Sequence, residues 1–225
     1  MNQETNKMSK SLIYAVLLFA ALATACQFNT KDKNNSKDST QAFLDSIPAQ
    51  PVDTGRVLIP IADETWKKRL SPIEANVNRI NAIEKWTNLF SKELDVSTEG
   101  GDASFYQNQG NTEKIVVNVF GETFQEHNEY YLLNKQLSYA FEKKYQYNRP
   151  IYYDSTAMKE NNDSVSFDFN KSTLVRNRYY FENGRIVYAS MDDKIDTASS
   201  GKVLSEETKR IIEFYSTLQK LGKND

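Results

Sequence analysis

Two stretches in the middle of the chain are near copies of each other, and they constrain the fold most. Residues 130–139 and 179–188 each read as an aromatic pair, two residues, an Asn-led dipeptide, a polar residue, an aliphatic residue, one residue and a Tyr. Asn183-Gly184 favours a type I′ turn, which needs positive φ at both central residues. Asn134-Lys135 is a weaker version, because Lys disfavours that region. The pattern predicts two antiparallel β-hairpins.

Further strands are expected around these hairpins. Residues 105–120 predict a looser third hairpin with a longer turn, and its returning strand, 114–120, is apolar on both faces and is placed inside the sheet. Alternation also predicts strands over 165–169 and 174–181. By the same alternation Leu137, Tyr139 and Phe141 share one face of their strand, while Gln136, Ser138 and Glu142 mark a face open to water.

Two amphipathic helices flank the strands. Ser71 as N-cap, Pro72 and Glu74 mark the start of the first, whose apolar stripe is Ile73, Val77, Ile80, Ile83, Trp86 and Phe90. Ser205 caps the second, and Gly222 ends it. The sequence therefore predicts one α+β domain over 56–222: an antiparallel β-meander of about six strands with both helices packed on one face.

The N-terminus has the pattern of an export signal. A polar segment with Lys7 and Lys10 precedes a short apolar run that ends in small residues at Ala25. The run is too short to span a bilayer comfortably. Residues 1–25 are therefore predicted to be a signal peptide, and the chain's single cysteine, Cys26, follows directly.

Ala23-Thr24-Ala25-Cys26 resembles the lipobox of bacterial lipoproteins, with Ala23 standing where Leu is usual. The resemblance implies that Cys26 carries acyl chains such as palmitate, which anchor the protein in a membrane. Gln27 stands where the family's inner-membrane retention signal places Asp, which implies the outer membrane. Residues 26–55 are almost wholly polar in their first half and are predicted to form a disordered tether.

The domain also has a resemblance of its own. The Glu99-Gly100-Gly101 entry, the later Gly121-Glu122-Thr123 and the paired Tyr-Tyr hairpins are similar to a group of mostly uncharacterised small outer-membrane lipoproteins. The hairpins are also similar in style to MORN-like meanders, without their regular period. These motifs are structural, so they carry no functional residue over to this chain.

No catalytic, metal or cofactor motif stands out. A single Cys excludes an internal disulfide and a multi-thiolate zinc site, and the net charge of −2 argues against nucleic acid as a partner. His127, the only histidine, lies in the polar stretch 122–129. We interpret His127 as an exposed loop residue; the alternative makes it a base or ligand flanked by Glu126 and Glu129.

These observations favour a non-enzymatic envelope lipoprotein that binds a protein or glycan partner through an exposed sheet face or loops. An inhibitor of an envelope or secreted enzyme is a related form of this hypothesis. A carboxylate-dependent hydrolase of cell-wall glycan is an alternative, since such an enzyme needs only two carboxylates. The candidate binding surface is aromatic and basic and comprises Tyr131, Arg149, Tyr152, Tyr153, Arg176, Arg178 and Tyr179, unless these tyrosines instead pair across strands as packing.

The anchor gives a direct test. Cys26→Ala should move the protein from the membrane to the soluble fraction of fractionated cells, because it removes the acylated thiol. A Cys26→Ala protein that stays with the membrane would contradict the anchor.

Overall fold

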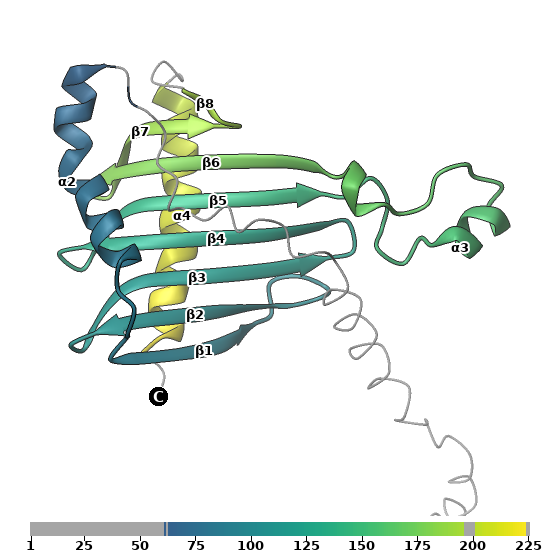
Figure 1. The fold of residues 1–225 in the computed structure, drawn as a ribbon, viewed down its shortest axis with the longest axis horizontal. Coiled ribbons are helices and arrows are strands. Elements are labelled where there is room, and N and C mark those ends of the chain that lie inside the picture. The colour runs from purple at the N-terminus through teal and green to yellow at the C-terminus, as the bar shows by residue number, and fades with distance from the viewer. Residues whose placement is uncertain (1–60, 62, 196–200, 224–225) are drawn as a thin grey trace, which may run out of the picture. The chain divides into compact units, whose positions relative to one another are not determined.

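The computed structural model describes Ile61, residues 63–195 and residues 201–223, all within the second of two units of the chain, Ala49–Asp225. The predicted signal peptide, Cys26 and the tether lie outside the described residues. One antiparallel sheet follows the order of the chain from β1 to β8 (Figure 1). Its strands are β1 (Asn88–Leu94), β2 (Gly101–Asn108), β3 (Asn111–Gly121), β4 (Phe124–Leu133), β5 (Gln136–Gln146), β6 (Thr173–Glu182), β7 (Arg185–Met191) and β8 (Lys194–Ile195).

The helices are α2 (Glu64–Asn81), α3 (Ser155–Glu160), α4 (Gly201–Leu221) and the 3₁₀ turn η2 (Phe169–Lys171). The predicted α+β class and antiparallel meander are confirmed. The sheet has eight strands rather than about six, because β1 occupies residues expected to be helical and β8 was not foreseen.

Three hairpins have the same turn geometry and the same register shift. Each has a two-residue turn with positive φ at both positions: Gln109-Gly110 (50° and 76°), Asn134-Lys135 (52° and 65°) and Asn183-Gly184 (51° and 73°). Each also has a register shift three residues before its turn, at Tyr106/Gln107, Tyr131/Leu132 and Tyr180/Phe181. The two predicted hairpins are confirmed. The third turn is shorter than expected, and its backbone geometry makes this hairpin a third copy of the other two.

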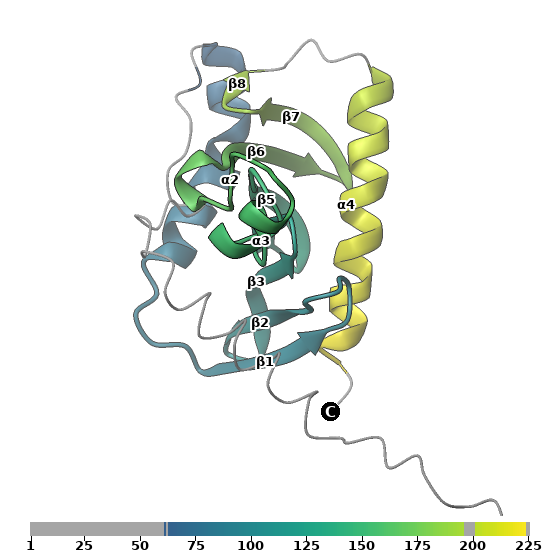
Figure 2. The same cartoon turned by 90° about the vertical axis from the view of Figure 1, so that its right-hand side faces the viewer.

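Each aromatic pair sends one ring to each face of the sheet. Tyr130 and Tyr179 pack in a core with α4 residues, whereas Tyr131 and Tyr180 pack in a second core with α2 residues. The helices therefore lie on opposite faces (Figure 2). The prediction that both helices cover one face and leave the other wet is wrong, because adjacent aromatic residues in a strand require an apolar cover on both sides.

Cross-strand tyrosine packing organises the α2 side. Ring centroids lie 5.6 Å apart for Tyr131 and Tyr139, 5.0 Å for Tyr139 and Tyr180, and 5.7 Å for Tyr180 and Tyr188. We call these four residues the tyrosine row; each is at most 2% exposed. The ring of Trp66 in α2 packs against Tyr188, the last member of the tyrosine row, with ring centroids 5.4 Å apart. Tilted and edge-on rings at such distances add about 0.5–1.5 kcal/mol per pair beyond their burial.

Helix α2 begins and ends earlier than expected. Asp63 caps it, its carboxylate accepting from the backbone N–H groups of Thr65 and Trp66 at 2.8 and 3.1 Å. Pro72 lies inside the helix, where it leaves the carbonyl of Lys68 without an N–H donor. The Ser71 hydroxyl donates to that carbonyl at 3.0 Å. The prediction that Ser71 and Pro72 start the helix is therefore wrong. Both residues lie in its interior, where the Ser71 hydroxyl compensates for the hydrogen bond that Pro72 removes.

Other sequence expectations also shift. Helix α4 begins at Gly201, so Ser205 is not its cap, although Gly222 follows its last residue as predicted. Arg210 fixes α4 to the sheet by contacting both oxygens of Glu142, at 3.0 and 2.7 Å. Residues 165–169 do not form the predicted strand; they belong to the connection between β5 and β6.

The repeated turns predict a stabilising change. Lys135 is exposed and holds φ at 65°, where Gly184 stands in the matching hairpin. Lys135→Gly should stabilise the fold by about 1 kcal/mol by removing left-handed strain, measured as a shift in urea midpoint. Gly184→Ala is the matched control and should destabilise by a similar amount. Equal or lower stability of Lys135→Gly would contradict this account of the turn.

Candidate functional site

A row of polar side chains crosses the α2 side of the sheet, four residues along the strands from the tyrosine row. The register places Asp102 opposite Asn118, Asn118 opposite His127, His127 opposite Lys143, and Lys143 opposite Arg176. These five residues come from β2 to β6 in order, and we call them the polar row. Neighbouring strands lie about 4.8 Å apart, so the row presents one polar group per strand.

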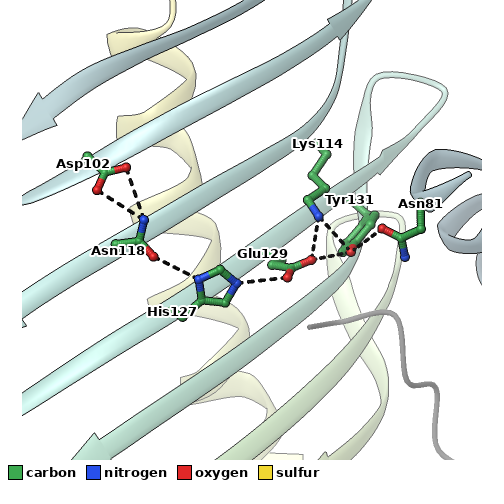
Figure 3. A network of polar contacts seen from close by, with 7 residues as sticks. All are labelled: Asn81, Asp102, Lys114, Asn118, His127, Glu129 and Tyr131. Atoms are coloured by element: carbon green, nitrogen blue, oxygen red, sulfur yellow. Dashed lines mark hydrogen bonds and ion pairs between the residues drawn. The ribbon is translucent and has the colours of Figure 1, made fainter. Parts of the chain in front are cut away.

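Hydrogen bonds join one half of the polar row to Glu129 (Figure 3). The Asn118 amide nitrogen lies 3.2 and 3.3 Å from the two oxygens of Asp102. His127 contacts the Asn118 amide oxygen through Nδ1 at 2.9 Å. Its Nε2 lies 3.0 Å from Oε1 of Glu129. Three strands are thereby linked by side chains as well as by their backbones.

The second oxygen of Glu129 meets the tyrosine row. Lys114 Nζ lies 2.8 Å from it, and the Tyr131 hydroxyl donates to it. The Lys114 ammonium also lies over the rings of Tyr106 and Tyr131, at 5.7 and 5.0 Å. The Tyr131 oxygen is in turn 3.0 Å from the side chain of Asn81, the last residue of α2. The network therefore runs from β2 to the end of α2.

The charge of Glu129 is fixed by its neighbours. Its side chain is only 1% exposed, and such burial by itself raises a carboxyl pKa. The hydrogen bond from His127, the charge of Lys114 and the hydrogen bonds from Lys114 and Tyr131 outweigh that effect, and lower the pKa of Glu129 to about 2. Burial and the Glu129 charge raise the pKa of Tyr131 instead. At neutral pH this is an ionised carboxylate beside a neutral phenol.

This arrangement limits the chemistry of the network. A glycosidase acid needs a raised pKa, and Glu129 has a lowered one. Both ring nitrogens of His127 already bond protein oxygens. Among residues 61, 63–195 and 201–223, no group of three His, Cys, Asp or Glu side chains is placed to hold a metal ion. None of the helices in that part of the chain is long and apolar enough to cross a membrane.

The expectation that His127 is an exposed loop residue is wrong. His127 lies in the middle of β4, and its side chain is half-buried. Of the two carboxylates expected to flank it, only Glu129 contacts it; Glu126 pairs with Lys144 at 2.8 Å. The residues opposite His127 on the neighbouring strands, Asn118 and Lys143, are polar as well, which no single stretch of sequence reveals.

The predicted aromatic-basic surface does not assemble as one patch. Tyr131 and Tyr179 are 0% and 1% exposed and belong to the two different cores. The alternative of cross-strand packing is confirmed for Tyr131, which lies in the tyrosine row. Tyr179 packs under α4, where its hydroxyl donates to Glu207 at 3.0 Å.

The other five candidate residues form two separate groups. Arg176 and Arg178 both bind Asp193, at 3.1 and 2.6 Å. Arg149, Tyr152 and Tyr153 lie together in the β5–β6 connection, residues 147–172, where the Arg149 guanidinium sits 5.5 Å from the Tyr153 ring centroid. Two groups at different places on the sheet therefore replace the single expected patch.

Sequence reasoning missed Asp102, Lys114 and Asn118. Each is an unremarkable polar residue in its own strand, and only the register brings them into line. One signal was present: Lys114 stands, in the third copy of the hairpin, at the place of Tyr139 and Tyr188. A charged residue at a position that the repeat fills with aromatic rings points to a buried counter-charge.

The fold and the network define an antiparallel α+β sheet protein with a buried ionic network on one face. Compared with known proteins, the chain matches no family model, no curated protein and no solved structure.

The network predicts that the free energy of unfolding falls at acid pH. The pKa of Glu129 is lower in the folded than in the unfolded chain, so its contribution is complete above the ordinary carboxyl value and is lost as the pH falls toward about 2. The contribution is on the order of 3 kcal/mol at neutral pH. Glu129→Gln should remove it, leave Lys114 buried without its anion, and flatten the loss of stability between pH 4.5 and 2 in urea titrations.

A surface pair serves as the control. Glu182 binds Arg69 at 2.6 Å in a more exposed setting, so Glu182→Gln should cost less than about 1 kcal/mol. If Glu129→Gln matches the parent protein in both stability and acid dependence, the lowered pKa of Glu129 is contradicted.

Proposed function

We propose that the chain is a lipid-anchored, non-enzymatic protein of the cell envelope that binds a protein partner through one end of its sheet. We call this end the loop end and define it as residues 95–100, 122–123 and 147–172. It lies opposite the turns of the three aromatic hairpins (Figure 1).

The observation that carries this proposal is the β5–β6 connection, residues 147–172. The other hairpins of the meander turn in two residues, apart from the short loop 95–100. Tyr147 and Ile151, at the start of the connection, are buried, but neither they nor any other residue of the connection belongs to either core cluster. Ordering a chain costs about 1–2 kcal/mol per residue in backbone entropy, so a long ordered loop with only two buried apolar side chains, outside both core clusters, favours a functional role.

The connection is held in shape by its own contacts. Asn148 bridges its two arms, donating to the Ser166 carbonyl at 3.0 Å and accepting from the Asp168 N–H at 2.9 Å. Arg149 pairs with Asp163 at 2.6 Å. The Tyr147 ring packs against that of Phe167, with centroids 5.3 Å apart. Preorganised loops lose less entropy on binding, which suits a recognition surface.

The segments of the loop end also contact one another and display apolar groups. Ile151 N–H donates to the Glu122 carbonyl at 2.7 Å, and the Tyr152 hydroxyl donates to Glu99 at 2.9 Å. Tyr152 is 52% exposed, and Val165 and Val96 are 36% and 47% exposed. A tyrosine with aliphatic side chains on rigid loops is typical of protein interfaces, where aromatic anchors supply most of the binding energy.

The sequence supports the envelope setting. The signal peptide, the lipobox-like Cys26 and the polar tether over 26–55 favour display of the folded domain from a lipid anchor in the outer membrane. A polar spacer of this length would let the loop end reach a partner beside the membrane.

Site-specific photo-crosslinking in intact cells tests this proposal. A photoreactive phenylalanine at Tyr152 or Val165 should give a discrete, reproducible adduct with another protein. Lys209, an exposed residue of α4, is the matched control position and should give none. Tyr152→Ala combined with Val165→Ser should abolish the adduct formed from a probe at Val96.

The same experiment can fail in an informative way. No adduct at any loop position, or the same adducts at Lys209 as at Tyr152, would contradict the loop end as a binding surface. Release of the protein from isolated envelope by glycan digestion alone would point to a glycan partner instead.

A further inference from the structure

Two arginines of β6 hold one carboxylate between them on the α2 side of the sheet. Arg176 and Arg178 lie two residues apart on this strand, so their side chains point to the same face. Nη1 of Arg176 lies 3.1 Å from one oxygen of Asp193, and Nη1 of Arg178 lies 2.6 Å from the other. The Asp193 carboxylate thus bridges two guanidinium groups, an arrangement that also suits a bound carboxylate or phosphate.

Burial holds the cations of this face in place. The Arg178 side chain is only 4% exposed, and its guanidinium lies 5.1 Å from the ring centroid of Phe141. Lys143 of β5 lies directly opposite Arg176 and is buried as well. Like charges directly opposite each other on paired strands are destabilising, and a bound anion reduces their repulsion. Three positive side chains on two neighbouring strands therefore favour an anion on this face.

A buried hydroxyl beside Arg178 supplies a further donor. Ser190 of β7 lies directly opposite Arg178, so the two side chains share the α2 side of the sheet. Ser190 is 0% exposed, and its hydroxyl makes no hydrogen bond within the described part of the chain. Buried polar groups are nearly always bonded, so this hydroxyl indicates a group that binds there. Three donor side chains match the three oxygens of a phosphate group better than the two of a carboxylate.

We propose that Arg176, Arg178 and Ser190 form a binding site for a phosphate group, which Asp193 occupies in the free protein. Asp193 reaches the arginines from the two-residue turn between β7 and β8. The phosphate group of a ligand displaces the Asp193 carboxylate from both guanidinium groups, and the turn moves away from β6. The site contains no residue of the loop end, so it stands or falls independently of the protein partner proposed above.

The turn that carries Asp193 is suited to this release. Asp192 and Asp193 hold φ at 51° and 57°, a left-handed conformation that strains a residue with a side chain. β8 is two residues long and pairs with β7 through two residue pairs. The Asp193 side chain is also 46% exposed, so a ligand can reach the carboxylate from solvent. Moving the turn therefore breaks few contacts and relieves strain.

Two matched substitutions in this turn test the site by calorimetric titration with inorganic phosphate at constant ionic strength. Asp193→Asn removes the internal carboxylate and should tighten phosphate binding by at least about tenfold, because a tethered competitor is lost. Asp192→Asn removes the same charge one residue away, where the carboxylate contacts Lys194 at 3.5 Å, and should leave phosphate binding as in the parent protein. Equal phosphate affinities of the two variants would overturn the proposal.

A second substitution tests the donors themselves. Arg176→Gln, added to Asp193→Asn, should abolish the gain in phosphate affinity; Arg176 is chosen because its side chain is 29% exposed and tolerates change better than Arg178. A gain that survives this substitution contradicts the site. Acetate should bind the Asp193→Asn protein more weakly than phosphate, and equal affinities would contradict the phosphate assignment.

The parent protein decides the question if Asp193→Asn fails to fold. Added phosphate should shift the backbone amide resonances of residues 192–195, because it competes with the Asp193 carboxylate, whereas chloride at the same ionic strength should not. Identical spectra in phosphate and chloride would rule the site out.

Discussion

Cross-strand packing of tyrosine rings is the interaction on which this fold depends. Within each hairpin the register shift and the left-handed turn bring the tyrosine of one strand opposite the tyrosine of the next. Neighbouring hairpins then meet with Tyr139 opposite Tyr180, so the rings form one continuous row. A two-residue aromatic pair cannot bury both rings on one face, so the sheet needs a helix on each side. The positions of α2 and α4 follow from that requirement.

The third copy of the hairpin replaces a ring with a charge. Lys114 occupies the position of Tyr139 and Tyr188, and its ammonium is buried enough to require a counter-charge, which Glu129 supplies. A buried pair of this kind adds little net stability over apolar packing, but removing one partner is costly. Such a pair favours one register over its neighbours, since a slipped strand would leave both charges unpaired. We infer that the network favours the observed register of β2, β3 and β4 and connects these strands to the end of α2.

Local features of the fold could be read from the sequence, and long-range ones could not. The turns at Asn134 and Asn183 depend on residues next to each other, so their hairpins were predictable. Helix α2 continues through Pro72, and the Ser71 hydroxyl bonds the Lys68 carbonyl that the proline leaves without an N–H donor, whereas a Ser-Pro pair usually marks a helix start. Residues 88–94 have the apolar spacing of a helix end, yet they form an edge strand because β2 is available to pair with them.

The candidate site shows the same division. Arg149, Tyr152 and Tyr153 lie together, as the sequence predicted, because one short stretch carries all three; their role as a binding surface stays a proposal. His127 was misplaced because its partners Asn118 and Glu129 are set by strand register rather than by proximity in the chain. Tyr131 and Tyr179 were assigned to a surface because composition alone does not separate a displayed aromatic residue from one that packs across strands.

The central claim is that each aromatic pair divides between two cores. Nuclear Overhauser contacts between labelled aromatic rings test it most directly. The account predicts contacts that link Tyr131, Tyr139, Tyr180 and Tyr188 in sequence, and a separate set that links Tyr130 to Phe214 and Tyr215. Contacts from α2 residues to the Tyr130 or Tyr179 ring, or from α4 residues to Tyr131 or Tyr180, would contradict it.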